Sequence, residues 1–203
     1  RGGGEAVQRR MKPDHLGLKS ALRTRIRARL GEIPASMRVA ASSRACDLLQ
    51  RQEHWQKARS VLFYVPMEDE LDLSPLWGIG AASGKILTLP RYLPGDSRYI
   101  ACHLRSPAES LVRGRFGIGE PAPDCPVFPL NQLDLAIVPG VAFDTSGRRL
   151  GRGRGFYDRL LREVRGTKCG VAFDEQIVGE IPVEPHDVRL NCILTPTQWL
   201  SFG

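Results

Sequence analysis

The sequence lacks any pair of closely spaced cysteines. Only five of its 203 residues are cysteine, an odd number, and they are spread along the chain without a CxxC pair. This argues against a zinc knuckle and against a disulfide framework. We therefore expect buried free thiols in a reducing compartment, and hence a cytoplasmic protein. The five residues are Cys46, Cys102, Cys125, Cys169 and Cys192.

Long hydrophobic runs are also missing. No apolar segment is long enough to span a bilayer, and no apolar core of a secretory signal is visible near the N-terminus. Residues 1–17 begin with glycine and arginine and have no periodic pattern, so we expect a disordered extension, with Met11 a candidate native start. The length and the 42% hydrophobic content suit one domain, or two at most; we expect a single domain over residues 18–203.

Aromatic residues are scarce, at 7% of the chain, and they do not alternate with basic residues as on a base-stacking surface. Basic residues are abundant, and the formal net charge is +7 with an isoelectric point of about 9.5. Such a balance suits nucleic acid, an acidic membrane face or small anions. Much of the excess lies in residues 19–29 and 148–165, so a focused anion site explains it as well as a nucleic-acid surface does.

The pattern of apolar residues predicts an α/β fold. Helical spacing begins at Leu18, a second helix is expected from Pro34 to Gln50, and Ser74-Pro75 begins a short third one. Short apolar runs predict strands at Ser60–Pro66, Lys85–Pro90, Tyr99–Leu104, Leu133–Val138, Lys168–Phe173 and Asn191–Thr195. Because helices and strands alternate, we expect a mostly parallel sheet with helices on its faces.

Basic residues flank the apolar stripe of the first predicted helix. Leu18, Leu22, Ile26 and Leu30 recur at helical spacing, and Lys19, Arg23 and Arg27 follow the first three by one position. A row at the edge of the buried face can reach a site in a cleft. The alternative is a solvated basic face without a ligand.

Charged residues follow three of the predicted strands. Ligands of parallel sheets bind beyond the carboxyl ends of the strands, where Glu70, Arg91 and the loop of alternating glycine and arginine at residues 151–155 are expected. Glycines, arginines and the start of a following helix together suit phosphate, although the loop is not a Walker A motif. An exposed loop that binds RNA non-specifically is the alternative. Glu70 either fixes a polar ligand or is a solvated acid.

Two acidic residues are candidate metal ligands. Asp158 closes the cationic loop, and a carboxylate beside phosphates points to a divalent cation. Asp187 lies in a loop before the last predicted strand and is a second candidate, whereas the neighbouring His186 is expected to be structural. The stretch from Gly117 to Pro121 is interpreted as a turn.

From Lys19 to about Pro196 the chain resembles the 5-formyltetrahydrofolate cyclo-ligase, or methenyltetrahydrofolate synthetase, family. The resemblance is carried by Lys19–Arg23, Glu70 after Tyr64–Pro66, Leu89–Arg91, Gly117–Pro121, Pro139–Arg159, Ala172–Gln176 and His186–Asp187. It implies a three-layer α/β/α fold related to the sugar-phosphate isomerase and CoA-transferase class. It also implies ATP- and Mg²⁺-dependent closure of 5-formyltetrahydrofolate to 5,10-methenyltetrahydrofolate, through a phosphorylated imidate, with release of ADP and phosphate.

The resemblance also implies residue roles. ATP would be held by Lys19, Ser20, Ala21, Leu22, Arg23, Arg149, Leu150, Gly151, Arg152, Gly153, Arg154, Gly155, Phe156 and Tyr157. Folate would face Val65, Glu70, Arg152, Gly153, Arg154, Gly155 and Phe156. Arg152, Arg154 and Tyr157 would be catalytic, and Asp158 and Asp187 would bind Mg²⁺.

The expected partners are reduced folate and ATP, without nucleic acid or membrane, and the expected state is a monomer. Two rival functions are an RNA-binding module and a sugar-phosphate isomerase that needs no ATP.

Overall fold

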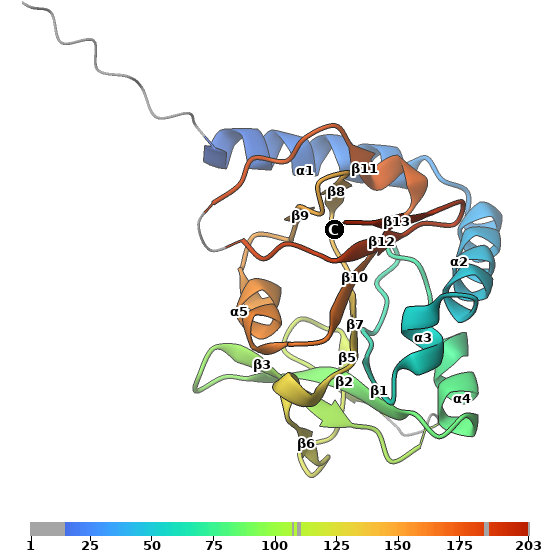
Figure 1. Ribbon diagram of the computed structural model, residues 1–203. Helices are drawn as coiled ribbons and strands as arrows, with labels where there is room; N and C mark the ends of the chain where they lie inside the picture. The colour runs from blue at the N-terminus through green and yellow to red at the C-terminus, as the bar shows by residue number, and fades with distance from the viewer. Residues whose placement is uncertain (1–14, 107, 109–110, 185–186, 203) are drawn as a thin grey trace, which may run out of the picture.

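The computed structural model describes residues 15–106, 108, 111–184 and 187–202. Within them, an eight-stranded sheet forms the centre of the molecule, in the order β13-β12-β10-β7-β1-β2-β3-β6 (Figure 1). Its strands are β1 Ser60–Leu62, β2 Ile86–Leu93, β3 Arg98–His103, β6 Val127–Phe128, β7 Leu135–Val138, β10 Thr167–Val171, β12 Cys192–Leu194 and β13 Trp199–Ser201. The strands predicted from the apolar runs therefore all exist, with shorter or shifted ends.

The middle of this sheet is parallel. β12, β10, β7, β1 and β2 pair in parallel, whereas β13, β3 and β6 add antiparallel strands at the two edges. Side chains of a strand alternate between the two faces, and both faces of β7 are buried: Leu135 and Ile137 join one hydrophobic cluster, and Ala136 and Val138 another. This explains why such strands appear in the sequence as continuous apolar runs.

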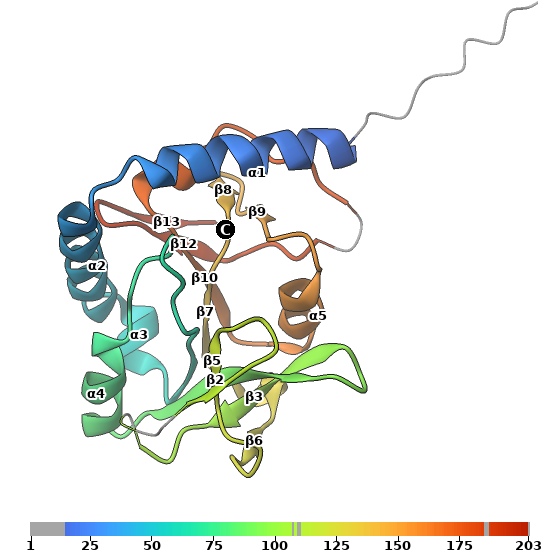
Figure 2. The same ribbon diagram turned by 180° about the vertical axis from the view of Figure 1, so that it is seen from behind.

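Helices cover both faces of the sheet. Figures 1 and 2 show α2, α3 and α4 on one side, α5 on the other, and α1 across the end that carries β8 and β11. The helices are α1 His15–Gly31, α2 Ala35–Gln50, α3 Glu53–Lys57, α4 Pro75–Ala82 and α5 Phe156–Glu163. This confirms the α/β fold with a mostly parallel sheet; the relation to sugar-phosphate isomerases and CoA-transferases stays a prediction.

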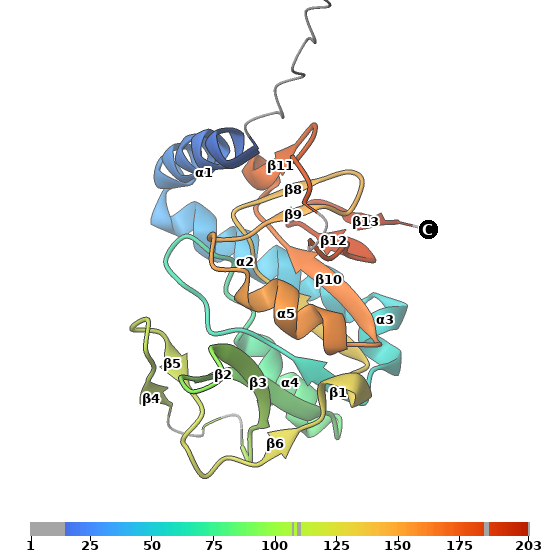
Figure 3. The same ribbon diagram turned by 90° about the vertical axis from the view of Figure 1, so that its left-hand side faces the viewer.

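Several short strands were not predicted. A small sheet contains β8 Ala142–Asp144, β9 Arg149–Leu150 and β11 Ile177–Val178, and a hairpin consists of β4 Val112–Arg113 and β5 Gly119–Glu120. The hairpin lies beside β2 (Figure 3). Two-residue strands carry almost no periodic signal, so hydropathy cannot find them.

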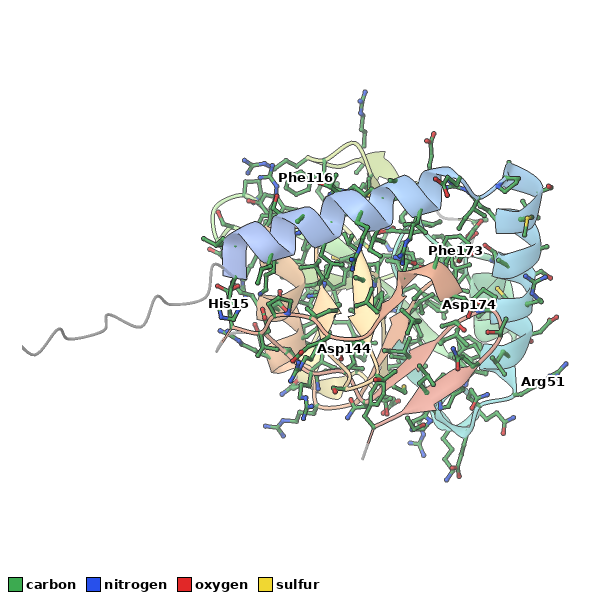
Figure 4. The ribbon with its side chains drawn as sticks, turned by 90° about the horizontal axis from the view of Figure 1, so that it is seen from above. His15, Arg51, Phe116, Asp144, Phe173 and Asp174 are labelled. Carbon is green, nitrogen blue, oxygen red and sulfur yellow. The ribbon has the colours of Figure 1, made fainter. Side chains whose placement is uncertain are left out.

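The first helix differs from the prediction in its register. It begins at His15 (Figure 4), and its buried row is Lys19, Leu22, Ile26 and Leu30, whereas Leu18 is 55% exposed. The assignment of Leu18 to the apolar stripe was therefore wrong. Lys19 takes the inner position because carboxylates of a distant loop face the helix there. Residues 15–17, which were expected to be disordered, belong to this helix, so that part of the prediction was wrong. The rest of the expected disordered extension, residues 1–14, lies outside the described residues.

Candidate active site

The site lies at the carboxyl ends of β1 and β7, two neighbouring strands whose following connections run to opposite sides of the sheet. From β1 the chain moves first to β2 on one side and later to β7 on the other, so the connections leaving β1 and β7 diverge at the carboxyl ends of these strands. A cavity of about 230 Å³ opens at this point. Tyr64 and Val65, which follow β1, and Pro139 and Gly140, which follow β7, form part of its wall.

One part of the cavity is aromatic. Phe156 packs edge-on against Tyr92 and Tyr99, with ring centroids 5.3 and 5.6 Å apart, and Phe116 lies 5.7 Å from Phe156. Arg154 adds charge, because its guanidinium lies over the Phe116 ring at 5.0 Å. These side chains offer flat apolar faces with a cation at their edge.

The other part contains charge that is already paired. Arg152 donates to Asp69 Oδ1 at 2.6 Å and to Glu70 Oε1 at 2.9 Å. Glu70 is only 8% exposed, and burial raises its pKa although Arg152 and the Met67 N–H oppose this effect. The structure thus brings together Glu70 and Arg152, two residues expected from the sequence to face the folate.

Arg149 and Asp158 form a second ion pair in the cavity wall. Arg149 Nη2 lies 2.9 Å from Asp158 Oδ1, and their side chains are 3% and 14% exposed. The buried Nε of Arg149 has no hydrogen-bond partner in the described part of the chain. Tyr157 lies beneath the Arg149 guanidinium at 5.7 Å. Burial raises the pKa of the Tyr157 phenol well above its ordinary value, so it stays protonated and is a hydrogen-bond donor.

Helix α1, near the N-terminus, contacts the loop of alternating glycine and arginine at residues 151–155, the Gly/Arg loop. Arg23 Nε donates to the Gly151 carbonyl at 2.9 Å. One turn earlier, Lys19 Nζ lies 2.7 Å from Glu184 Oε2 and 2.9 Å from Asp187 Oδ2. Burial alone would lower the pKa of Lys19, but these carboxylates raise it overall. The two basic clusters seen in the sequence therefore meet in space.

Two glycines of the loop have backbone angles that favour glycine. Gly153 has φ +102° and Gly155 has φ +63°, and Gly155 immediately precedes helix α5. A Cβ atom at Gly153 would lie 3.6 Å from the Arg23 guanidinium carbon. The glycines thus turn the loop in front of the α5 N-terminus, where free N–H groups favour anions.

Other predicted site residues are placed differently. Ser20 and Ala21 are exposed, whereas Leu22 and Leu150 are buried in the hydrophobic core and direct no side chain into the site. Arg91 does not reach the cavity, because its guanidinium donates to the carbonyls of Ala122 and Pro123 at 2.9 and 2.7 Å. The expectation that Arg91 joins the ligand site was therefore wrong.

The donor chemistry of Asp158 and Asp187 fits Mg²⁺. Both are carboxylates, and Mg²⁺ commonly uses one or two carboxylates together with phosphate oxygens and water. In the structure each already accepts a hydrogen bond from a cation, Arg149 or Lys19. Among the described residues no group of three or more His, Cys, Asp and Glu side chains is gathered for a metal. The residues thus fit a cation that arrives with phosphate, rather than one held by protein alone. His186 lies outside the described residues.

Sequence reasoning missed Glu120. It belongs to the stretch interpreted as a turn, and Gly117 does turn there with φ +76°, but Glu120 itself lines the cavity and is 7% exposed. A glutamate before proline carries no local signal of burial.

Among the described residues no helix has the length and apolar character needed to cross a membrane.

Comparison with known proteins identifies the family. The profile of the 5-formyltetrahydrofolate cyclo-ligase family matches residues 16–196. The Escherichia coli 5-formyltetrahydrofolate cyclo-ligase is 38% identical over 148 residues, covering 70% of this chain and 80% of that protein. The mouse 5-formyltetrahydrofolate cyclo-ligase is 29% identical over 187 residues, covering 87% and 92%. The chain belongs to the 5-formyltetrahydrofolate cyclo-ligase family.

Solved structures agree with this. The solution structure of Aquifex aeolicus 5,10-methenyltetrahydrofolate synthetase superposes with a TM-score of 0.81 at 33% identity, covering 91% of this chain and 92% of that one. A Mycoplasma pneumoniae 5,10-methenyltetrahydrofolate synthetase, at 21% identity and a TM-score of 0.69, covers 88% and 98% and shares the fold. The chain is therefore an enzyme, a cyclo-ligase of folate metabolism, as the resemblance predicted.

Proposed function

We propose that this enzyme closes 5-formyltetrahydrofolate to 5,10-methenyltetrahydrofolate at the expense of ATP, with Mg²⁺, and releases ADP and phosphate. The observation that carries the proposal is the hydrogen bond from Arg23 to the Gly151 carbonyl. It joins the cationic row of α1 to the Gly/Arg loop, so that residues 128 positions apart form one anion site next to the cavity.

ATP phosphates fit between α1 and the loop. Lys19 and Arg23 supply charge from the helix, Arg149, Arg152 and Arg154 supply it from the loop side, and the turn at the glycines opens backbone N–H groups at the start of α5. An arginine-rich surface for RNA would display these guanidinium groups on an open face. Arg149 and Arg152 instead line the cavity and are held there by carboxylates of its wall, which favours a small-molecule ligand over an open RNA surface.

Asp158 and Asp187 are the residues we propose for Mg²⁺. When phosphate arrives, Arg149 and Lys19 gain a further anionic partner, and Asp158 and Asp187 become available to a cation. Bound there, Mg²⁺ would neutralise charge on the phosphates and assist their transfer.

The reaction needs activation of the formyl oxygen, which is otherwise a poor leaving group. In the proposed sequence this oxygen attacks the γ-phosphorus of ATP and the bond to ADP breaks, which gives a phosphorylated imidate. The N10 nitrogen of the folate then attacks the formyl carbon and loses its proton to water, the carbon–oxygen bond breaks, and phosphate leaves. Such phosphoryl transfer depends on positioning and positive charge more than on a protein nucleophile.

Arg152, Arg154 and Tyr157 are the proposed catalytic residues. Glu70 and Asp69 bind Nη2 of Arg152 at the cavity wall, and its other N–H groups would be the donors to the transferred phosphoryl group. Arg154 lies over Phe116 at the same wall, and the protonated Tyr157 phenol is a donor to a developing negative oxygen. Val65, Glu70 and Phe156 line the cavity on the folate side.

The test is an optical assay of the purified protein. Mixed with 5-formyltetrahydrofolate, ATP and Mg²⁺, it should form the methenyl product with one ADP per turnover, and omission of ATP or of Mg²⁺ should abolish the signal. Product formed without ATP would contradict the proposal. We further propose a cytoplasmic monomer that binds no nucleic acid and no membrane; its five cysteines are buried, in keeping with thiols in a reducing compartment.

A further inference from the structure

Glu120 is a cavity residue that the roles above do not use. It ends strand β5, is 7% exposed and lines the cavity beside Tyr99 and Phe116. Its Oε2 accepts a hydrogen bond from the Tyr92 N–H at 3.1 Å. Its Oε1 accepts none from the described residues, and none of their lysines or arginines forms an ion pair with Glu120.

Local packing holds the Glu120 carboxyl group in one place. Its Cγ, Cδ and Oε1 atoms occupy the space beside Gly114, where a Cβ atom would collide with them. Gly114 closes the β4–β5 hairpin through a hydrogen bond to the Ile118 carbonyl at 2.8 Å. The carboxyl group is thus fixed from the hairpin on one side and from the Tyr92 backbone of β2 on the other.

A buried carboxylate is unfavourable when one of its oxygens accepts no hydrogen bond, and Oε1 accepts none from the described residues. Burial raises the pKa of Glu120, since the charged form loses its water, and only the Tyr92 N–H and the charge of Arg91 oppose this. Glu70 differs, because its Oε1 accepts from Arg152 and its Oε2 from the Met67 N–H at 3.1 Å. Glu120 therefore keeps an oxygen with capacity for a ligand's donors, on the aromatic side of the cavity.

We propose that Glu120 determines specificity for the bicyclic ring of the folate, by accepting hydrogen bonds from its 2-amino group and the adjacent ring N–H. The inference rests on the proposed function. These two donors lie side by side on one edge of the ring, an arrangement that a carboxylate matches. Tyr99, Phe116 and Phe156 beside Glu120 offer flat faces for the same ring.

The test compares binding of 5-formyltetrahydrofolate with binding of its analogue that lacks the 2-amino group, by calorimetry without ATP. We expect the wild type to bind the natural compound about 10- to 100-fold more tightly. Glu120→Gln should reduce this ratio to about 1–3, because a carboxamide offers only one acceptor atom. Glu175→Gln is the matched control, since Glu175 is exposed and remote from the cavity lining, and it should keep the wild-type ratio.

Gly114→Ala is a second, independent variant. It leaves the Glu120 carboxylate intact but displaces it, and it should lower the same ratio with an unchanged half-saturation for ATP. If Glu120→Gln is unfolded at the temperature of the binding measurement, Gly114→Ala provides the test. Two results would refute the role of Glu120 and leave the proposed function standing. Folded Glu120→Gln could keep the wild-type ratio, or the wild type could fail to distinguish the two compounds. A wild type that does not bind 5-formyltetrahydrofolate overturns the proposed function as well.

Discussion

Replacing Lys19 by methionine tests how α1 serves both stability and nucleotide binding. The Lys19 side chain is 7% exposed and holds Glu184 and Asp187, which are 31% and 19% exposed. Lys19→Met keeps most of the side-chain volume but leaves two neighbouring carboxylates without their cation. Breaking a fully buried pair costs about 3–5 kcal/mol; because these carboxylates retain some water, we expect a loss of about 1–3 kcal/mol in the free energy of unfolding.

The pH dependence of this loss has a definite sign. The carboxylates raise the pKa of Lys19 above its ordinary value of 10.5 in spite of burial. A raised lysine pKa contributes its full stabilisation below the unfolded pKa and loses it as the pH rises through the folded value. Denaturant unfolding should therefore show a constant difference between wild type and Lys19→Met near neutral pH, and a shrinking one above about pH 10.

The same variant should weaken the use of ATP. Loss of one charged contact to phosphate, about 1.5–3 kcal/mol, corresponds to a roughly 10- to 150-fold higher half-saturation for ATP, with folate half-saturation unchanged. Lys57→Met is the control: Lys57 is 75% exposed and pairs with the exposed Glu53 one turn away, so this substitution should leave the free energy of unfolding almost unchanged. If Lys19→Met lost stability but kept its ATP dependence, Lys19 would be structural and the nucleotide assignment refuted.

Three further variants probe the rest of the site. Gly155→Ala should lose about 1–2 kcal/mol of stability and much of its ATP-dependent turnover, because Gly155 has φ +63°, whereas the open site Gly95→Ala should resemble the parent; equal turnover in both would refute the loop's role. Asp158→Asn should raise the Mg²⁺ concentration needed for half-maximal rate, and an unchanged Mg²⁺ titration would remove Asp158 from the metal site. Burial raises the pKa of Glu70, so ionising it destabilises the fold; as the pH rises above the ordinary glutamate value of 4.5, unfolding measurements should favour Glu70→Gln increasingly over the wild type, and parallel curves would contradict this.

The sequence alone determined the features that depend on local or periodic signals. The central strands and helix α2 follow from apolar periodicity and from proline or charged residues at their ends, because these properties act within a few residues. The motifs around the Gly/Arg loop also led to the correct family, because the order and spacing of motif residues can be read directly from the sequence.

Only the tertiary structure decided which distant groups meet. Lys19, and not Leu18, lies on the inner face of α1, because the carboxylates of Glu184 and Asp187 lie opposite Lys19. These two residues are far from Lys19 in the sequence. Arg91 lies in a sequence position that resembles a ligand site, yet its guanidinium binds backbone carbonyls instead. Ion pairs and buried carboxylates depend on three-dimensional proximity and on loss of water, and neither leaves a periodic mark in the sequence.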